Sequence, residues 1–169
     1  LTDTPSFMGS TEDLGIARNS SPLPLLRQDF FIDPYQVFET KYLGGDCILI
    51  ILSMLSDSQA RELYQTAQEI ELDSIFEVHN ENEFERALSM NAKLIGINNR
   101  NLHTFETDIV TTVNLASKFS DDLIIISESG IYNNTQIKML REKNVNAFLV
   151  GESIIKSDNM TKAIQDLLD

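Results

Sequence analysis

The sequence predicts an α/β fold in which parallel strands alternate with helices. Six short apolar runs recur about every 25 residues, and stretches with helical periodicity separate them. The runs are almost continuously apolar, which is typical of parallel strands that helices cover on both faces. This alternation indicates consecutive right-handed βαβ units.

The predicted strands are the apolar runs themselves. None approaches the ~18 apolar residues of a membrane span, so the sequence predicts no membrane partner. In chain order the runs occupy residues 23–26, 47–52, 75–78, 94–97, 123–126 and 147–150.

The predicted helices begin after residues that favour the N-cap position. Asp33 is followed by Pro34, which suits a first helical turn, and this pair opens a helix over 35–41. Asp57 precedes an amphipathic helix over 59–71. The remaining helices, 81–90, 109–118, 135–143 and 160–168, follow Asn80, Asp108, Asn133 and Asp158.

Composition limits the function classes. The 169 residues are 42% apolar, which suits a folded domain, and they carry 26 acidic against 13 basic side chains. A net charge of −13 disfavours binding to nucleic-acid phosphates, so no nucleic-acid partner is expected. Cys47 has no second cysteine with which to form an intrachain disulfide, and we therefore expect a cytoplasmic location. His79 and His103 lie outside metal-ligand spacing, so no metal site is expected.

Length leaves the α/β architecture open. A (β/α)8 barrel takes about 250 residues, or roughly 31 per unit. By this measure 169 residues supply about 5.4 units, and a barrel would be incomplete. Spacing alone therefore favours an open doubly wound sheet. Both architectures hold their functional groups where strands end and loops begin.

Polar side chains stand at several strand ends. Period-two alternation puts Glu77, Asn98 and Glu128 on the apolar faces of their strands, where a polar group is costly unless it is paired or functional. Two glutamates near one arginine form a candidate acid–base site. If these faces share an axis, the converging residues are Gln28, Phe30, Leu49, Glu77, Asn98, Arg100 and Glu128.

Each of these residues also has a purely structural interpretation. Glu77 suits a loop-facing cap or an ion pair, and Asn98 and Arg100 suit hydrogen bonds to the loop backbone. Gly130 and Gly151 suit turns that require a positive φ angle. The residues alone leave both interpretations open.

An ordered set of segments carries a family resemblance. The set is Thr2-Asp3, Phe7-x-Gly9-Ser10, Asp29-Phe30-x-Ile32-Asp33, Glu77-Val78-His79, Gly96-Ile97-Asn98-Asn99-Arg100-Asn101-Leu102, Ile126-Ser127-Glu128-Ser129-Gly130-Ile131 and Leu149-Val150-Gly151-Glu152-Ser153. It resembles indole-3-glycerol-phosphate synthase, an enzyme family of tryptophan biosynthesis. That family is a TIM (β/α)8 barrel, so the resemblance overrides the open sheet. It implies a single domain over 1–169 that holds the tail of strand two and units three to eight, without the first β/α unit.

The resemblance also implies an activity. The family closes 1-(2-carboxyphenylamino)-1-deoxyribulose 5-phosphate to indole-3-glycerol phosphate and releases carbon dioxide and water, which is a carbon–carbon lyase reaction. By resemblance Glu77 is the general base for dehydration. Asn98 and Arg100 would contact the anthranilate side of the substrate, and Glu128 would complete the polar network. No metal or organic cofactor is implied.

The implied substrate-binding residues come from the same resemblance. Backbone amides of four residues would cradle the phosphate, in the loops after strands seven and eight where such barrels bind phosphate. These four are Ser129, Gly130, Gly151 and Glu152. The apolar wall against the anthranilate ring would be Phe7, Phe30, Leu49, Leu102 and Val150. The implied partner is therefore a phosphorylated small molecule.

Two departures from the family predict weak substrate binding and impaired activity. The family's general acid is the lysine of a Lys-Asp-Phe motif, and this chain has Gln28 there, which cannot deliver a proton. Losing a positioned acid typically costs ~10²–10⁴-fold in rate. Arg27 is adjacent, but alternation directs it to the opposite face, and a guanidinium does not release its proton in proteins. The family's Glu-x-Lys-x-x-Ser-Pro-Ser motif, which supplies a second lysine, is absent from this sequence.

Two other functions remain open at this point. Gln28 favours a non-catalytic homologue that only binds a phosphorylated ligand, whereas the retained polar residues 77, 98, 100 and 128 disfavour it. A related sugar-phosphate isomerase barrel, such as phosphoribosylanthranilate isomerase, leaves residues 96–102 unexplained. Because an incomplete barrel has open edges, self-association through those edges is also expected.

Overall fold

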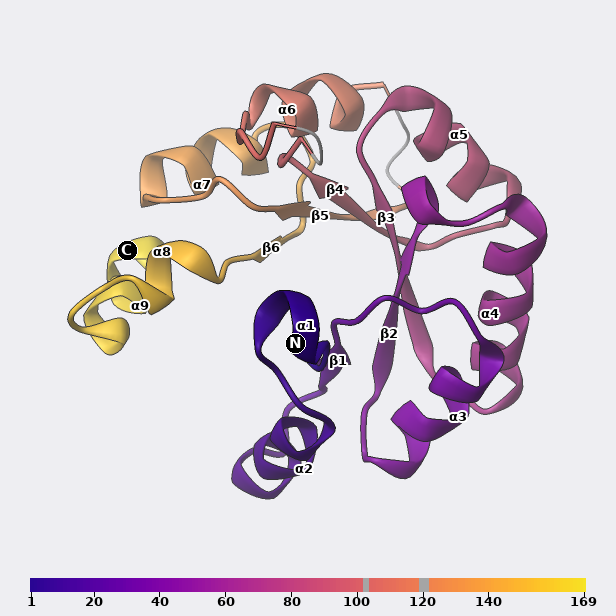
Figure 1. Ribbon diagram of the computed structural model, residues 1–169. Coiled ribbons are helices and arrows are strands. Elements are labelled where there is room, and N and C mark those ends of the chain that lie inside the picture. Colours follow the sequence, from indigo (N-terminus) through magenta and orange to yellow (C-terminus); the bar gives the residue numbers. More distant parts are fainter. Residues whose placement is uncertain (102–103, 119–121) are drawn as a thin grey trace. The chain divides into compact units, whose positions relative to one another are not determined.

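A computed structural model describes residues 1–101, 104–118 and 122–169, apart from the side chains of Ser6 and Phe7. Strands and helices alternate along it, as Figure 1 shows. The chain divides into two compact units, Leu1–Glu77 with Arg86–Ala92 and Val78–Glu85 with Lys93–Asp169. None of the described helices is long and apolar enough to cross a membrane.

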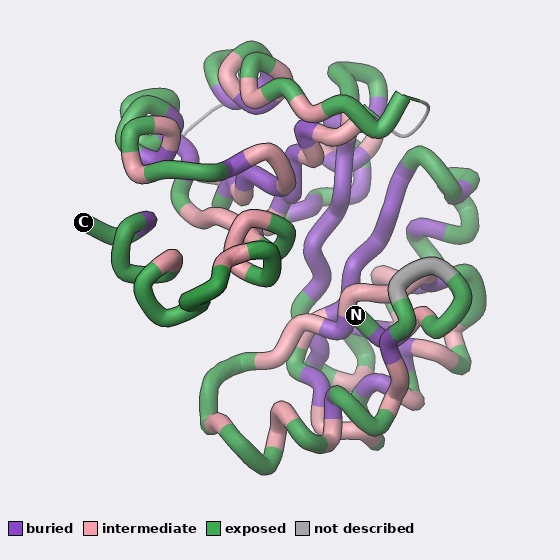
Figure 2. The backbone as a smooth tube through the Cα atoms, turned by 60° about the vertical axis from the view of Figure 1, so that its left-hand side comes forward, coloured by how far each residue is buried: buried purple, intermediate pink, exposed green. Residues whose placement is uncertain are grey.

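The first unit is built on parallel strands. β1 (Leu26–Arg27) pairs with β2 (Cys47–Ile51), and β2 pairs with β3 (Asp73–Val78). Helices α3 and α4 pack against β2, which is buried from Ile48 to Ile51. Figure 2 colours the buried stretches of the backbone purple. The helical elements are α1 (Thr4–Phe7), α2 (Thr11–Ser20), α3 (Pro34–Tyr42), the 3-10 helix η1 (Leu52–Met54) and α4 (Asp57–Glu69).

The second unit repeats the same pattern. β4 (Leu94–Asn98) pairs in parallel with β5 (Ile124–Glu128), and β5 pairs with β6 (Ala147–Leu149). Helix α5 (Glu81–Ser89) begins in this unit and ends in the first. The other helices are α6 (Val110–Ala116), α7 (Asn134–Arg141), α8 (Glu152–Ile155) and α9 (Met160–Leu168). In both units the paired strands follow chain order, which is the βα repeat of a TIM barrel.

The start of the chain departs most from prediction. The strand predicted over 23–26 is wrong, because β1 begins at Leu26. Pro22 and Pro24 lack the N–H that a strand donates to its neighbour, so pairing starts only after them. Residues 1–3, where the chain begins, are not assigned to a strand, but Thr2 N donates to Gln28 O at 3.2 Å and so contacts the segment after β1.

Helices α1, α2 and α8 have no predicted counterpart. Ser10 caps α2 in a capping box, because its Oγ accepts from Asp13 N at 3.4 Å while Asp13 Oδ2 accepts from Ser10 N at 2.8 Å. This serine–aspartate spacing is visible in the sequence. The N-cap of α4 is Ser56 rather than the predicted Asp57.

Candidate active site

The first-unit strands present two faces. Leu49 and Ile75 are register partners, as are Ile51 and Glu77, so all four side chains share one face. Glu77 is 4% exposed, which makes it a buried carboxylate at the end of β3. Alternation along the strands therefore predicts correctly that Leu49 and Glu77 lie on one face within this unit.

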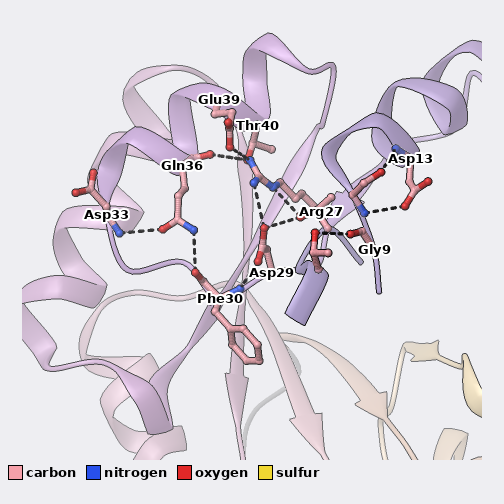
Figure 3. Close-up of polar contacts among 12 residues, drawn as sticks. Gly9, Asp13, Arg27, Asp29, Phe30, Asp33, Gln36, Glu39 and Thr40 are labelled. Carbon is pink, nitrogen blue, oxygen red and sulfur yellow. Dashed lines mark hydrogen bonds and ion pairs between the residues drawn. The ribbon is translucent and has the colours of Figure 1, made fainter. Parts of the chain in front are cut away.

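Arg27 occupies the opposite face, as predicted, and its buried guanidinium joins β1 to α3 (Figure 3). Nη1 donates to Glu39 Oε2 at 2.8 Å and to Thr40 Oγ1 at 3.3 Å, and Nη2 donates to Asp29 Oδ2 at 3.0 Å. Nε donates to Thr2 Oγ1 at 3.0 Å, and the Thr2 hydroxyl donates to the same Asp29 oxygen at 2.5 Å. Arg27 is thus held by hydrogen bonds and ion pairs to Thr2, Asp29 and α3.

The segment after β1 carries Gln28 and Phe30, and side chains hold its backbone. Phe30 N donates to Asp29 Oδ1 at 2.8 Å, and Phe30 O accepts from Gln36 Nε2 at 2.9 Å (Figure 3). Gln28 is half-buried, and its carbonyl accepts from Thr2 N at 3.2 Å. Two predicted substrate-facing residues therefore lie on a fixed backbone even though the strand before them is short.

Asn98 and Glu128 are register partners at the ends of β4 and β5, and they share a face as alternation predicts. Glu128 is 2% exposed, and Asn98 Oδ1 accepts from Arg100 N at 3.0 Å. The register partner of Glu128 in β6 is Leu149. Val150 follows that strand and is half-buried, so its predicted contact with the substrate ring stays a prediction.

Asn99 is an important residue of this region that the prediction omits. Its Nδ2 donates to Ser127 Oγ and to Ser129 O, each at 3.0 Å. Its Oδ1 accepts from Thr112 Oγ1 at 2.8 Å, and the Thr112 and Ser127 hydroxyls lie 2.9 Å apart. The three side chains form a buried network in which each polar group has a partner. Alternation is the signal that identifies it, because Asn99 lies on the opposite face from Asn98.

The loop after β5 has an unusual backbone. The φ angles are +63° at Ser129 and +72° at Gly130, and the left-handed region costs a non-glycine residue about 1–3 kcal/mol. A Cβ atom on Gly130 would lie 3.0 Å from Thr107 Cβ, so a glycine is required there. The turn interpretation of Gly130 is thus confirmed. That of Gly151 is wrong, because its φ is −122° and a Cβ there would meet nothing within 4 Å.

Arg100 is held by an ion pair and by a backbone carbonyl. Nη2 donates to Glu152 Oε2 at 2.6 Å, and Nη1 donates to Phe105 O at 3.0 Å. The other oxygen of Glu152 accepts from Lys156 Nζ at 2.6 Å. Hydrogen bonds from Lys156, and then from Arg100, hold the pKa of the Glu152 carboxyl below its ordinary value. Two predicted site residues, Arg100 and Glu152, are thus in direct contact.

A second contact joins the two predicted phosphate loops. Ser153 Oγ in α8 donates to Ile131 O at 2.9 Å, which brings the segments around Gly130 and Gly151 together. The predicted Leu102 lies outside the described residues, and so does the side chain of Phe7. Within the described part of the chain, no group of three or more His, Cys, Asp or Glu side chains is arranged to hold a metal ion.

His79 belongs to the capping of α5. Glu83 Oε2 accepts from His79 N at 2.8 Å and lies 3.1 Å from His79 Nδ1, while Glu83 Oε1 accepts from Asn80 Nδ2 at 2.7 Å. Burial alone would raise the pKa of Glu83, but the hydrogen bonds from His79 and Asn80 bring it below its ordinary value. These bonds support the structural interpretation of His79.

Comparison with known proteins gives one consistent result. A sequence model of the family described as indole-3-glycerol phosphate synthase matches residues 1–167. Proteins of that name from Legionella pneumophila (strain Lens), Polaromonas naphthalenivorans (strain CJ2) and Acinetobacter baumannii (strain AYE) are each 45% identical to this chain. The alignments cover 99% of this chain and 65%, 64% and 63% of those proteins. The chain thus spans just under two thirds of the length of the curated relatives it matches.

The match also decides the architecture that spacing left open. The chain is an incomplete TIM (β/α)8 barrel, and the open doubly wound sheet that spacing favours is wrong. Spacing fails here because both architectures are assembled from βαβ units of similar length.

Proposed function

Since this chain belongs to the indole-3-glycerol phosphate synthase family, we propose that it carries residues with which that family forms indole-3-glycerol phosphate. The reaction closes 1-(2-carboxyphenylamino)-1-deoxyribulose 5-phosphate and releases carbon dioxide and water. One observation carries the proposal: Glu77 is the next-to-last residue of β3, and Asn98 and Glu128 are the last residues of β4 and β5, so all three stand near strand ends, where this family is expected to carry its polar residues.

Glu77 is our candidate for the general base. Dehydration needs a group that removes a proton from the substrate, and a carboxylate within reach of that proton can do so. Glu77 lies inside β3, one residue before its end and beside its register partner Ile51, so a strand rather than a loop carries the carboxylate. Mounting a reactive group on a regular element keeps its position well defined.

The segments around Gly130 and Gly151 are our candidates for the phosphate cradle, and the observations in the second unit support this. The left-handed backbone at Ser129 and Gly130 turns the chain sharply after β5. Gly151 has open space where a side chain would stand. Backbone N–H groups in such turns attract anions without adding a competing full charge.

We propose further that this chain is a poor catalyst. Gln28 occupies the position of the family's general acid, and its neutral amide can donate a hydrogen bond but cannot deliver a proton. Arg100, the proposed cation for the anthranilate side, already pairs with Glu152 at 2.6 Å. An anionic substrate therefore competes with a carboxylate for this guanidinium, which weakens binding.

Calorimetry tests the binding part of the proposal. Indole-3-glycerol phosphate should bind more tightly than inorganic phosphate, because only the former also contacts the ring-facing residues. Arg100→Met should weaken the binding of indole-3-glycerol phosphate. Arg18→Met alters an arginine in a solvent-exposed pair with Asp46 and should leave the affinity for indole-3-glycerol phosphate unchanged. Equal affinity for both ligands would reduce the function to phosphate binding, and no binding of either would overturn the proposal.

Turnover tests the catalytic part. The chain and its Gln28→Lys variant should both form product near background. Adding a segment with the family's Glu-x-Lys-x-x-Ser-Pro-Ser motif to Gln28→Lys should raise the rate by ~10²–10⁴-fold. A normal family rate in the unmodified chain would show that the missing lysines are not needed.

A non-catalytic phosphate-binding homologue is the second candidate, and Gln28 is the observation that favours it. Binding of indole-3-glycerol phosphate without turnover in any of the lysine variants would support this function. It would assign the retained carboxylates to binding or folding. We keep the cytoplasmic location as a proposal that rests on the lone Cys47.

We also propose self-association through strand edges. Within the described residues β1 has a paired neighbour on one side, β2, and β6 likewise pairs with β5. An open parallel edge is a template for a strand of another chain. Light scattering should give a mass that rises with concentration above 19.1 kDa, and a concentration-independent monomer would refute this.

A further inference from the structure

Each unit contains one glutamine that holds the loop before its helix through the same three hydrogen bonds. Gln36, in the first turn of α3, accepts from Ile32 N at 2.8 Å and from Asp33 N at 3.1 Å, and donates to Phe30 O at 2.9 Å. The side-chain oxygen and nitrogen are both used. Figure 3 shows the bonds from this side chain to Phe30 and Asp33.

Gln136 repeats this arrangement in the second unit, in the first turn of α7. It accepts from Tyr132 N at 2.8 Å and from Asn133 N at 3.3 Å, and donates to Gly130 O at 3.3 Å. In both cases the amide partners are four and three residues back, and the carbonyl partner is six residues back. We call each set of three bonds a glutamine clamp.

A clamp is more than ordinary helix capping. A capping box joins the third helical side chain to the N-cap N–H only. Gln59 of α4 has that position and residue type, and its Oε1 accepts from Ser56 N at 3.2 Å and from Ser56 Oγ at 2.8 Å. Within the described part of the chain, Gln59 makes no hydrogen bond to a residue before the N-cap Ser56, so it holds none of the loop further back. Gln59 is therefore a matched control for the two clamps.

Both clamps act on segments of the proposed site. The Gln36 clamp fixes the carbonyl of Phe30, whose N–H is fixed by Asp29, so both ends of the proposed ring-facing residue are held. The Gln136 clamp fixes the carbonyl of Gly130, and Asn99 fixes that of Ser129. A left-handed pair persists only when its surroundings hold it, and these two amides do so.

We propose that Gln36 and Gln136 are positioning residues, the first for the ring-facing Phe30 and the second for the phosphate-facing Ser129 and Gly130. The inference rests on the proposed function and deepens it by assigning each loop its own support. It predicts that the two glutamines affect the binding of different parts of the ligand. Gln136 should govern phosphate affinity, and Gln36 should govern only the additional affinity of a ligand that carries the aromatic ring.

The test uses Gln36→Met, Gln136→Met and Gln59→Met, titrated with inorganic phosphate and with indole-3-glycerol phosphate. Gln136→Met should lower the affinity for both ligands by about tenfold, since it removes three hydrogen bonds of modest net strength. Gln36→Met should leave the affinity for inorganic phosphate unchanged and lower the affinity for indole-3-glycerol phosphate by about tenfold. Gln59→Met should change neither.

Amide exchange separates this inference from the proposed function. Gln136→Met should accelerate exchange at Tyr132 and Asn133 alone, and Gln36→Met at Ile32 and Asp33 alone. If the parent chain binds neither ligand, the proposed function fails, and local acceleration still establishes the clamps. Unchanged exchange, or faster loops with unchanged ligand affinity in a parent that binds, would overturn the positioning role.

Discussion

Asn99 Nδ2 donates to Ser129 O at 3.0 Å, so a buried amide directly after β4 holds a left-handed residue after β5. Asn99 also donates to Ser127 and accepts from Thr112. The proposed phosphate loop thus depends on a residue that has no predicted contact with any ligand.

Asn99→Ala should therefore lower the free energy of unfolding by about 2–3 kcal/mol, because it leaves the buried Thr112 amide and Ser127 hydroxyl with fewer partners. Equilibrium denaturation measures this. Asn114→Ala, an exposed change in α6, should stay within about 0.5 kcal/mol of the parent. Equal effects would show that the network is not important for stability.

Two glycine substitutions should have opposite signs. Gly130→Ala should destabilise by about 1–3 kcal/mol, because φ is +72° and the new methyl group would lie 3.0 Å from Thr107 Cβ. Gly15→Ala should stabilise by about 0.5–1 kcal/mol, because Gly15 is inside α2 with nothing within 4 Å of its Cβ position. Thermal unfolding of both variants tests the pair, and a stabilising Gly130→Ala would contradict the assigned backbone.

Arg27→Met should lower the free energy of unfolding by about 3–5 kcal/mol. It leaves the Asp29 carboxylate, whose side chain is 10% exposed, without the guanidinium that pairs with it. Arg18→Met removes an arginine from an exposed pair and should cost about 1 kcal/mol or less. Denaturant titration compares the two variants. Similar losses would mean that the buried pair contributes no more than a surface pair.

Cys47 should be almost unreactive in the folded protein. Burial first, and then the nearby Asp73, raise the pKa of the Cys47 thiol from 9.0 to about 12. Since the thiolate is the reactive form, Cys47 should be alkylated near pH 8 about a thousandfold more slowly in the folded protein than in the unfolded protein. The folded rate should rise as pH increases toward 12. Rapid labelling in native buffer, measured by mass spectrometry, would contradict this environment.

Lys156→Met should raise the pKa of the Glu152 carboxyl toward its ordinary value of 4.5, because the Lys156 hydrogen bond is the largest cause of its lowering. Carboxyl NMR titration measures the shift, and Lys162→Met in α9 should leave it unchanged. A carboxyl with a lowered folded pKa contributes stability above its unfolded pKa, and that contribution is lost as pH falls through the folded pKa. An unmoved Glu152 titration would mean that Arg100 alone sets it.

Much of the fold followed from local patterns. Helix α9 has the predicted bounds, and the strand faces of Glu77, Asn98 and Arg27 follow from alternation, since a side-chain period of two needs no tertiary information. The strand predicted over 23–26 is wrong because its apolar residues lie beside Pro22 and Pro24, which cannot donate the hydrogen bonds of a strand. Spacing also predicted an open sheet instead of a barrel. The number of residues per βα unit does not specify whether the strands form an open sheet or curl into a barrel.

The sequence by itself determined the βα repeat, the polar strand ends and the family, and it is the basis for our proposal that Gln28 replaces the family's lysine. Only the tertiary structure decided which groups meet: Arg100 with Glu152, Asn99 with Ser129, and the two glutamines with their loops. These contacts join residues whose backbones are brought together by folding, and hydrogen bonds require distances near 3 Å that no spacing in the chain specifies. Residue types thus identify the chemistry available, and packing determines which of those groups are already occupied.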